Sequence, residues 1–488
     1  MKKGKEEKHL DWQTTKKERI CYYVGDNAKS LEGQLVQIFM TTFLLLSGVN
    51  LVIVATVTLI VKVIDTLDDM LFGYLVDRLK LPKGKFLSRI AGEGKYLPWY
   101  RLTFWMFPIV TVLLFRMPQG ANEWVKIAYF AVFYLLYDIT FTIVDIPMNS
   151  AIMTITGNLE ERNSIITNKT IITALAVMIV VPLMNFLISE YVGMSIKNVV
   201  LMMSVVFFVL MLPLTRVTKE HNAIAAQQEG GEEKYTFREM LRSLGSNRFL
   251  LILFIGNILY SCFRGSDTIT LFASYYLYGN SQLLVIPMLI IIVPTMLSQK
   301  WAEALCKKHD NYRVALISQI INFGLRLLVF ILGYRNIWLH VVVLTATAIP
   351  SIIHSMATQY MMLDCIEYGK FKTGNECAGI TFALNSFVSK VASSVSSSLC
   401  LIILGLFGWI TIQAESFAEI AEKGITQPAS ALTGLWFVYA GMWVIGTGLS
   451  VLLLLLYRLK NKDVSLMAKV NSGELDREDA LAQMSRVY

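Results

Sequence analysis

Residues 62–78 read KVIDTLDDMLFGYLVDR and place three carboxylates, those of Asp65, Asp68 and Asp69, at the end of an apolar run that begins at Leu51. An unpaired carboxylate in hydrocarbon costs several kcal/mol, so acids within membrane segments usually face a water-filled cavity or bind a cation or a proton. The stretch therefore predicts a coupling-ion site within a membrane-spanning helix of a transporter.

The rest of the chain has the composition of a membrane protein. Of its 488 residues, 55% are hydrophobic and only 16% are charged, and the mean hydropathy is +0.53. Seven Lys and Arg residues lie among the first twenty positions, without the apolar core of a cleavable signal peptide, so we expect a cytoplasmic N-terminus. The net charge of +8 is concentrated in short loops, which the positive-inside rule explains better than nucleic-acid binding.

Loop charge also fixes how many times the chain crosses the membrane before residue 78. The N-terminal tail and the loop at 78–95 are both basic, so both should lie in the cytoplasm, with an even number of crossings between them. Each crossing needs roughly 20 residues, so two spans must fit between about 22 and 78. This forces the charges of both segments toward membrane depth.

Ten further apolar segments follow, with a polar segment at 218–246 between the fourth and the fifth of them. They lie at about 97–117, 124–150, 165–190, 195–217, 247–278, 282–300, 313–334, 337–363, 378–408 and 431–458. We therefore expect an all-α integral membrane protein with twelve transmembrane helices in two six-helix halves, as in the major facilitator fold. The expected parts of this multi-pass protein of a bacterial cell membrane are a cytoplasmic tail at 1–21, halves at 22–217 and 247–458, a cytoplasmic linker at 218–246 and a cytoplasmic tail at 459–488.

The three acids of the second span share one broad helix face, because they are three and four residues apart. Carboxylates this close cannot all ionise cheaply, so one should be protonated or a cation should lie among them. The alternative is that Lys62, three residues before Asp65, neutralises one acid in a salt bridge. That pairing would leave Asp68 and Asp69 unexplained.

The fourth span carries a second polar face, because Asp138, Thr142 and Asp145 recur at i, i+4 and i+7. A hydroxyl among carboxylates is a hard-oxygen ligand set, suited to sodium or a proton. The alternative for Thr142 is a hydrogen bond to the backbone of its own helix. In the eleventh span, a lysine at depth such as Lys390 needs an acidic partner or an anionic substrate.

Five stretches resemble the glycoside-pentoside-hexuronide:cation symporters of the major facilitator superfamily. They are YYVGD at 22–26, DTLDD at 65–69, GKYLPW at 94–99, TIVDIP at 142–147 and DCIEYGKFKTG at 364–374. Their order along the chain is more specific than any one of them, and the resemblance extends over about 22–458. The resemblance implies a secondary transporter and not an enzyme, with sodium or a proton as coupling ion and no other cofactor.

Residue by residue, the resemblance implies two sites. The cation site would be formed by Asp65, Asp68, Asp69 and Thr142. The substrate site would involve Lys29, Ser30, Asp145, Asn149 and Lys390. Ser30 replaces a sugar-binding acid of the family and Asn149 replaces a stacking tryptophan, so a galactoside does not follow, whereas an acidic sugar such as a hexuronide can be accommodated.

We also expect gates at the cytoplasmic ends of the helices, where basic loops would bind helix ends and acids in one conformation. The gating residues expected are Gly73, Asp77, Arg78, Glu367 and Lys372.

The function predicted from the sequence is cation-coupled symport of a sugar, glycoside or hexuronide by alternating access. The partners expected are this small molecule and the lipid bilayer, without nucleic acid, and the sequence indicates no protein partner. One alternative keeps the fold and makes the substrate a lipid or a drug, or makes the protein a proton antiporter. A remote alternative is an intramembrane metal-dependent transferase, because Asp-rich helical boxes bind magnesium diphosphates, although catalysis would not explain the duplicated spans.

Overall fold

The computed structural model of the chain describes residues 12–78, 91–92, 94–221, 245, 247–264, 266–285, 287, 290–374 and 378–486. Within the helices, some side chains also lie outside the description, namely those at 66–71, 73–78, 159, 163, 266–268, 292–293, 373, 378–380, 382–383 and 386. The regular secondary structure of the described part is helical, apart from an isolated β-bridge between Ser47 and Gln413.

The chain divides into two compact units. The first comprises Met1–Glu233 and also Thr411–Ile425, and the second comprises Lys234–Ile410 and Thr426–Tyr488. The sequence did not indicate that a segment between the last two expected spans would belong to the first unit.

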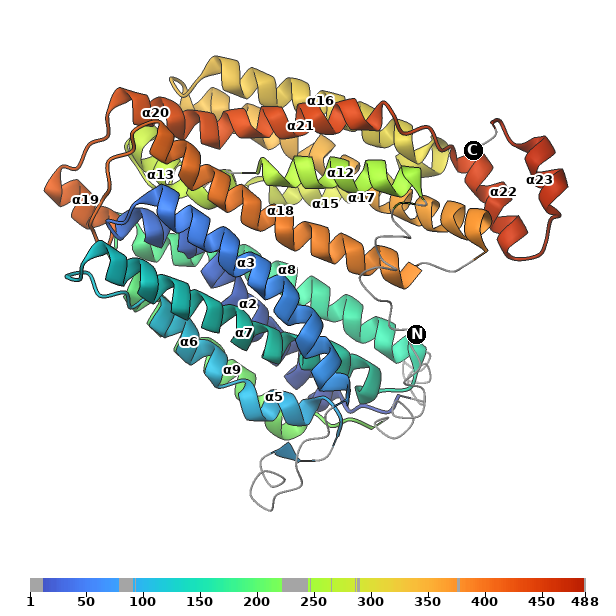
Figure 1. Cartoon of the computed structure of the whole chain (residues 1–488), viewed down its shortest axis with the longest axis horizontal. Helices are drawn as coiled ribbons and strands as arrows, with labels where there is room; N and C mark the ends of the chain where they lie inside the picture. Colours follow the sequence, from blue (N-terminus) through green and yellow to red (C-terminus); the bar gives the residue numbers. More distant parts are fainter. Residues whose placement is uncertain are drawn as a thin grey trace, which may run out of the picture. The chain divides into compact units, whose positions relative to one another are not determined.

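In the first unit, each expected span corresponds to a helix or to a pair of helices (Figure 1). These are α2 (Lys16–Leu46), α3 (Leu51–Arg78), α5 (Leu97–Thr103) with α6 (Met106–Leu114), α7 (Glu123–Ile155), α8 (Leu159–Ile188) and α9 (Ile196–Val217). The short helix α19 (Phe417–Lys423) lies in the 411–425 segment. The parity argument thus placed the two helices α2 and α3 correctly before residue 78.

Close packing of α2 against α9 depends on a glycine. A Cβ built on Gly25 would lie 2.8 Å from the Cβ of Leu214, a separation that side chains do not tolerate. Small residues at such crossings let helix backbones approach closely, which is a main source of packing energy between membrane helices. Next to this crossing, α2 also packs on α8, while α3 packs on α7.

The second unit contains the remaining spans and two C-terminal helices. The spans are α12 (Arg248–Cys262) with α13 (Ser266–Tyr278), α15 (Ile292–Lys308), α16 (Asn311–Leu332), α17 (Ile337–Thr373), α18 (Ala378–Leu406), and α20 (Ala429–Trp436) continued by a π-helical turn (Phe437–Gly441) and α21 (Met442–Leu454). The expected span at 282–300 is displaced, because α15 continues beyond the apolar run to Lys308. The tail forms α22 (Asn461–Asn471), which packs on α17, and α23 (Arg477–Gln483).

Length and hydropathy alone identify fewer crossings than the sequence analysis predicts. Among the described residues, seven helices are long and apolar enough to span a membrane, and α5 with α6, bent by 43°, would make an eighth. The helices α2 and α3 are not among them, and both carry charged residues in the middle of their length. The charge-based argument was needed to find these two, and they carry most of the candidate site.

Candidate functional site

A buried charge network joins α2, α7 and α8. On α2, Nζ of Lys29 lies 2.6 Å from Oδ1 of Asp145 on α7 and 3.3 Å from Oδ1 of Asp26. On α8, Nζ of Lys169 lies 3.1 Å from the same oxygen of Asp26, whose side chain is completely buried. Two lysines therefore face two aspartates, and their charges compensate where an unpaired ion would be costly.

Asn149 connects the network at its exposed end. Its Nδ2 donates to Oδ2 of Asp145 at 2.9 Å, and its Oδ1 accepts from Nζ of Lys169 at 3.0 Å. A lysine ammonium can only donate, which fixes the orientation of this amide. Asn149 is exposed and 29% of the Asp145 side chain is accessible, whereas Asp26 is sealed. Within the network, accessibility therefore increases from Asp26 toward Asn149.

The sequence analysis named part of this network. Lys29, Asp145 and Asn149 are among the predicted substrate residues, and Ser30, next to Lys29 on α2, is half-buried. Asp26 and Lys169 were not predicted as site residues. A signal was present for each, because Asp26 precedes Lys29 by three residues on one helix face and Lys169 is the only lysine of α8.

A second charge cluster lies between α3 and α7. Nζ of Lys62 lies 2.6 Å from Oδ1 of Asp138 and 3.4 Å from Oδ2 of Asp65, and 5.0 Å above the ring of Tyr134. The anticipated pairing of Lys62 with Asp65 is thus present, but the shorter contact is to Asp138 on the neighbouring helix. One cation faces two carboxylates here, so the three groups carry a net charge of −1 when ionised.

The predicted cation site overlaps this cluster. Asp65 is buried on α3, and Thr142 is buried on α7, the helix that packs against α3. The side chains of Asp68 and Asp69 lie outside the described part. The participation of all four residues in a cation site stays a prediction.

A further acid, Glu32, lies three residues after Lys29 on α2 and contacts α9. Its side chain is completely buried, and its Oε1 lies 2.6 Å from the hydroxyl of Ser204 on α9. Within the described residues its Oε2 has no hydrogen-bond partner. Glu32 thus belongs to neither charge cluster, and the Ser204 hydroxyl connects it to α9.

Of the predicted gating residues, the structure describes the side chains of only Glu367 and Lys372, in the second unit. The side chains of Gly73, Asp77 and Arg78 lie outside the described part. Glu367 accepts from Nδ2 of Asn471 at 2.8 Å through its Oε2, which ties α17 to the C-terminal helix α22. Lys372 places its ammonium 5.7 Å from the ring centroid of Tyr368.

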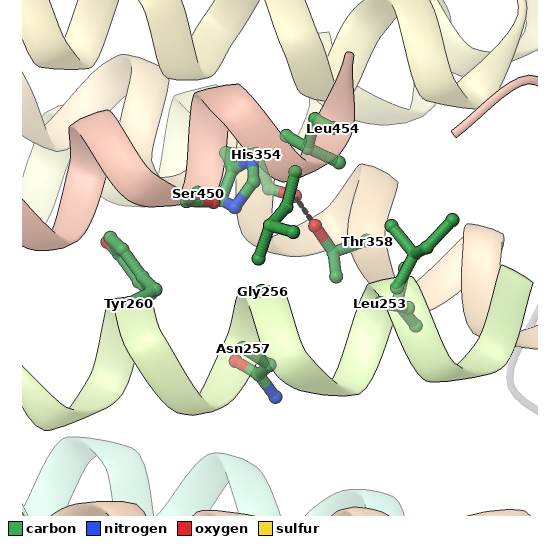
Figure 2. A pocket seen from close by; sticks show the side chains of 10 residues that line it. Leu253, Gly256, Asn257, Tyr260, His354, Thr358, Ser450 and Leu454 are labelled. Carbon is green, nitrogen blue, oxygen red and sulfur yellow. Dashed lines mark hydrogen bonds between the residues drawn. The ribbon is translucent and has the colours of Figure 1, made fainter. Parts of the chain in front are cut away.

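In the second unit, Lys390 is exposed on α18. Residues of α12, α17 and α21 line a small, mostly apolar cavity of about 20 Å³, which Figure 2 shows with His354 beside Ser450. A carbonyl only accepts, so the 3.1 Å contact of Nδ1 with the Ala315 carbonyl assigns the proton to Nδ1. The cavity has room for about one water molecule and is too small for a sugar.

Comparison with known proteins identifies relatives over almost the full length. The family model described as "MFS/sugar transport protein" matches residues 21–461. The isoprimeverose transporter of Lactiplantibacillus pentosus is 22% identical over 486 residues, covering 95% of this chain and 93% of that protein. The glucuronide carrier protein homolog of Escherichia coli (strain K12) is 24% identical over 426 residues, covering 83% of this chain and 86% of that protein.

A solved structure supports the same architecture. The D-xylose-proton symporter superposes with a TM-score of 0.54 at 11% identity, covering 90% of this chain and 96% of the other. At this identity the likeness concerns the fold alone, and it confirms the predicted major facilitator fold.

Proposed function

This chain belongs to the MFS/sugar transport proteins, in their glycoside-pentoside-hexuronide:cation symporter branch, and from that premise we propose that it transports an acidic glycoside together with a cation. The cation-coupled symport of a sugar or glycoside follows from the family. The acidic character of the substrate is our inference from the charge network of α2, α7 and α8.

The observation that supports an acidic substrate is the position of Lys169. Its ammonium lies between the sealed carboxylate of Asp26 and the exposed amide of Asn149. A substrate carboxylate that displaces the amide would meet an ammonium already held in place by Asp26. Asp145 and Asn149 would serve as acceptor and donor for sugar hydroxyls at the same opening.

The coupling ion would bind next to this network, at Asp65, Asp68, Asp69 and Thr142. The cluster of Lys62, Asp65 and Asp138 lacks one positive charge, which favours cation or proton uptake nearby. Because α7 carries both Thr142 and Asp145, ion and substrate would act on one helix. If the ion raises the affinity for substrate, the substrate must raise the affinity for the ion by the same factor.

We place the protein in the cell membrane with both termini in the cytoplasm. The basic tail and the basic loop at 78–95 support this orientation through the positive-inside rule. The ends of α2 and α6, and the beginning of α9, then lie on the outer side.

Uptake into proteoliposomes tests the proposal. Labelled methyl glucuronide and methyl glucoside would be offered under a sodium gradient alone and under a proton gradient alone, with protein-free liposomes as the blank. We expect gradient-driven accumulation of the glucuronide, and the effective gradient identifies the ion. Equal uptake of both sugars would contradict the acidic substrate, and transport of lipids or drugs without any glycoside would contradict the proposal as a whole.

The remote transferase alternative is set aside, because the family consists of transporters.

A further inference from the structure

The segment Thr411–Ile425 is anchored to the first unit by backbone hydrogen bonds. The amide of Ala414 donates to the carbonyl of Leu46 at the end of α2, at 3.1 Å. The carbonyl of Glu415 accepts from the amide of Ile196 at the beginning of α9, at 3.3 Å. The segment is therefore built into the end of this unit that we assign to the outer side.

Side chains add two further anchors. Nε2 of Gln413 donates to the carbonyl of Gln119 at 3.0 Å, in the loop between α6 and α7. Glu415 forms an ion pair with Lys197 at the beginning of α9. The 411–425 segment thus connects three separate parts of the first unit.

A cleft of about 550 Å³ lies among these anchors. It is lined by the ends of α2 and α6, the beginning of α9 and the 411–425 segment. Ligand pockets for small molecules typically measure 300–1,000 Å³, so this cleft has room for a glycoside. Phe43 and Phe115, with ring centroids 5.0 Å apart, are among the residues of its lining.

Polar groups of the lining have unused hydrogen-bonding capacity. The hydroxyl of Ser195, a residue only 8% exposed, has no partner within the described residues, and neither does the buried Oε1 of Gln119. Buried polar groups without partners are rare in proteins and call for an explanation. Here they offer one donor and one acceptor to a ligand.

The charge of the lining favours an anion. Arg116 is exposed in the cleft and forms no ion pair with any described residue, whereas Lys197 and Glu415 neutralise each other. A guanidinium can bind a carboxylate through two parallel hydrogen bonds. The lining thus carries a net charge of +1 together with the unpaired donor and acceptor.

We propose that this cleft is a second binding site for an acidic glycoside, with the carboxylate on Arg116 and the sugar hydroxyls on Ser195 and Gln119. The inference rests on the proposed function, since it assigns the same substrate class to a site separate from the network around Lys29. A substrate captured here would be held at the outer end of the first unit before it reaches the central network.

Equilibrium binding of labelled methyl glucuronide to the purified full-length protein in detergent tests the proposal. We expect two sites per chain. Asp145→Asn should remove the central site and leave one, and the double variant R116Q/S195A should likewise leave one. Combining all three substitutions should abolish binding, while Arg216→Gln, at the other end of α9, should keep both sites.

The outcomes separate the two proposals. One site that is lost in Asp145→Asn and unaffected in R116Q/S195A would overturn the second site while supporting the central one. One site that is lost only in R116Q/S195A, without gradient-driven uptake by the wild type, would support the cleft and overturn the central assignment. Absence of glucuronide binding in the wild type, or displacement of all cleft binding by added anionic lipid, would overturn the cleft proposal.

Discussion

The ammonium of Lys62 on α3 lies 2.6 Å from the carboxylate of Asp138 on α7. The same ammonium also contacts Asp65. Removing Lys62 and removing Asp138 should therefore have different effects on stability. Lys62→Met leaves two carboxylates without their cation, whereas Asp138→Asn leaves one lysine and one aspartate. We expect Lys62→Met to destabilise the protein by roughly 3–5 kcal/mol, the usual cost of breaking a buried pair, and Asp138→Asn to cost clearly less.

Thermal unfolding of both variants in the same detergent measures this order. A variant Asp138→Asn that unfolds at or below the temperature of Lys62→Met would show that the net charge of the cluster does not decide its stability.

Asp69→Asn should separate coupling from translocation. Loss of this carboxylate should weaken cation binding and with it the coupling, so gradient-driven accumulation should fall until internal and external substrate concentrations are about equal. Exchange of labelled for unlabelled substrate, which needs no gradient, should continue in part. Accumulation at the wild-type level would remove Asp69 from the cation site.

Lys169→Gln should discriminate between substrates. A hydrogen bond to a charged group contributes about 1.5–3 kcal/mol, so KM for methyl glucuronide should rise roughly tenfold or more. KM for a neutral glycoside, if one is transported, should change little. Lys219→Gln, which removes an exposed lysine just after α9, is the matched control. An equal rise in KM for both substrates would mean that Lys169 only maintains the structure.

Gly25→Ala should loosen the first unit. The added Cβ would meet Leu214 at 2.8 Å, and overpacking of this kind costs typically about 1–3 kcal/mol. Gly120→Ala is the control, because nothing lies within 4 Å of a Cβ built there. Comparison of the unfolding temperatures checks the prediction, and it is wrong if the two alanine variants are equally stable.

Sequence patterns predicted the helices because each span is a local property of apolar length and flanking charge. The helices α2 and α3 were predicted from the basic segments on either side of them. A hydropathy criterion alone does not identify them, because both carry charged residues. The position of α15 was less accurate, because the apolar run and the helix end at different residues.

The sequence pointed to those residues of the network and cluster that share one helix face or match a family motif. The face of Asp138 and Asp145 followed from spacing, and Lys29 from the resemblance. The contact between Asp26 and Lys169 joins residues 143 positions apart, and no spacing rule reports such a contact. The partner of Asp138 was missed for the same reason, because Lys62 comes from a different helix.

The 411–425 segment has a mechanical consequence through Gln427. This side chain donates to the carbonyl of Ile410 and accepts from its amide, both at 2.9 Å. The residues just before and just after the segment are thus clipped together in the second unit, while the segment itself is fastened to the first. Both ends of the 411–425 segment therefore start from one hydrogen-bonded pair, and a substitution at Gln427 should loosen both ends together.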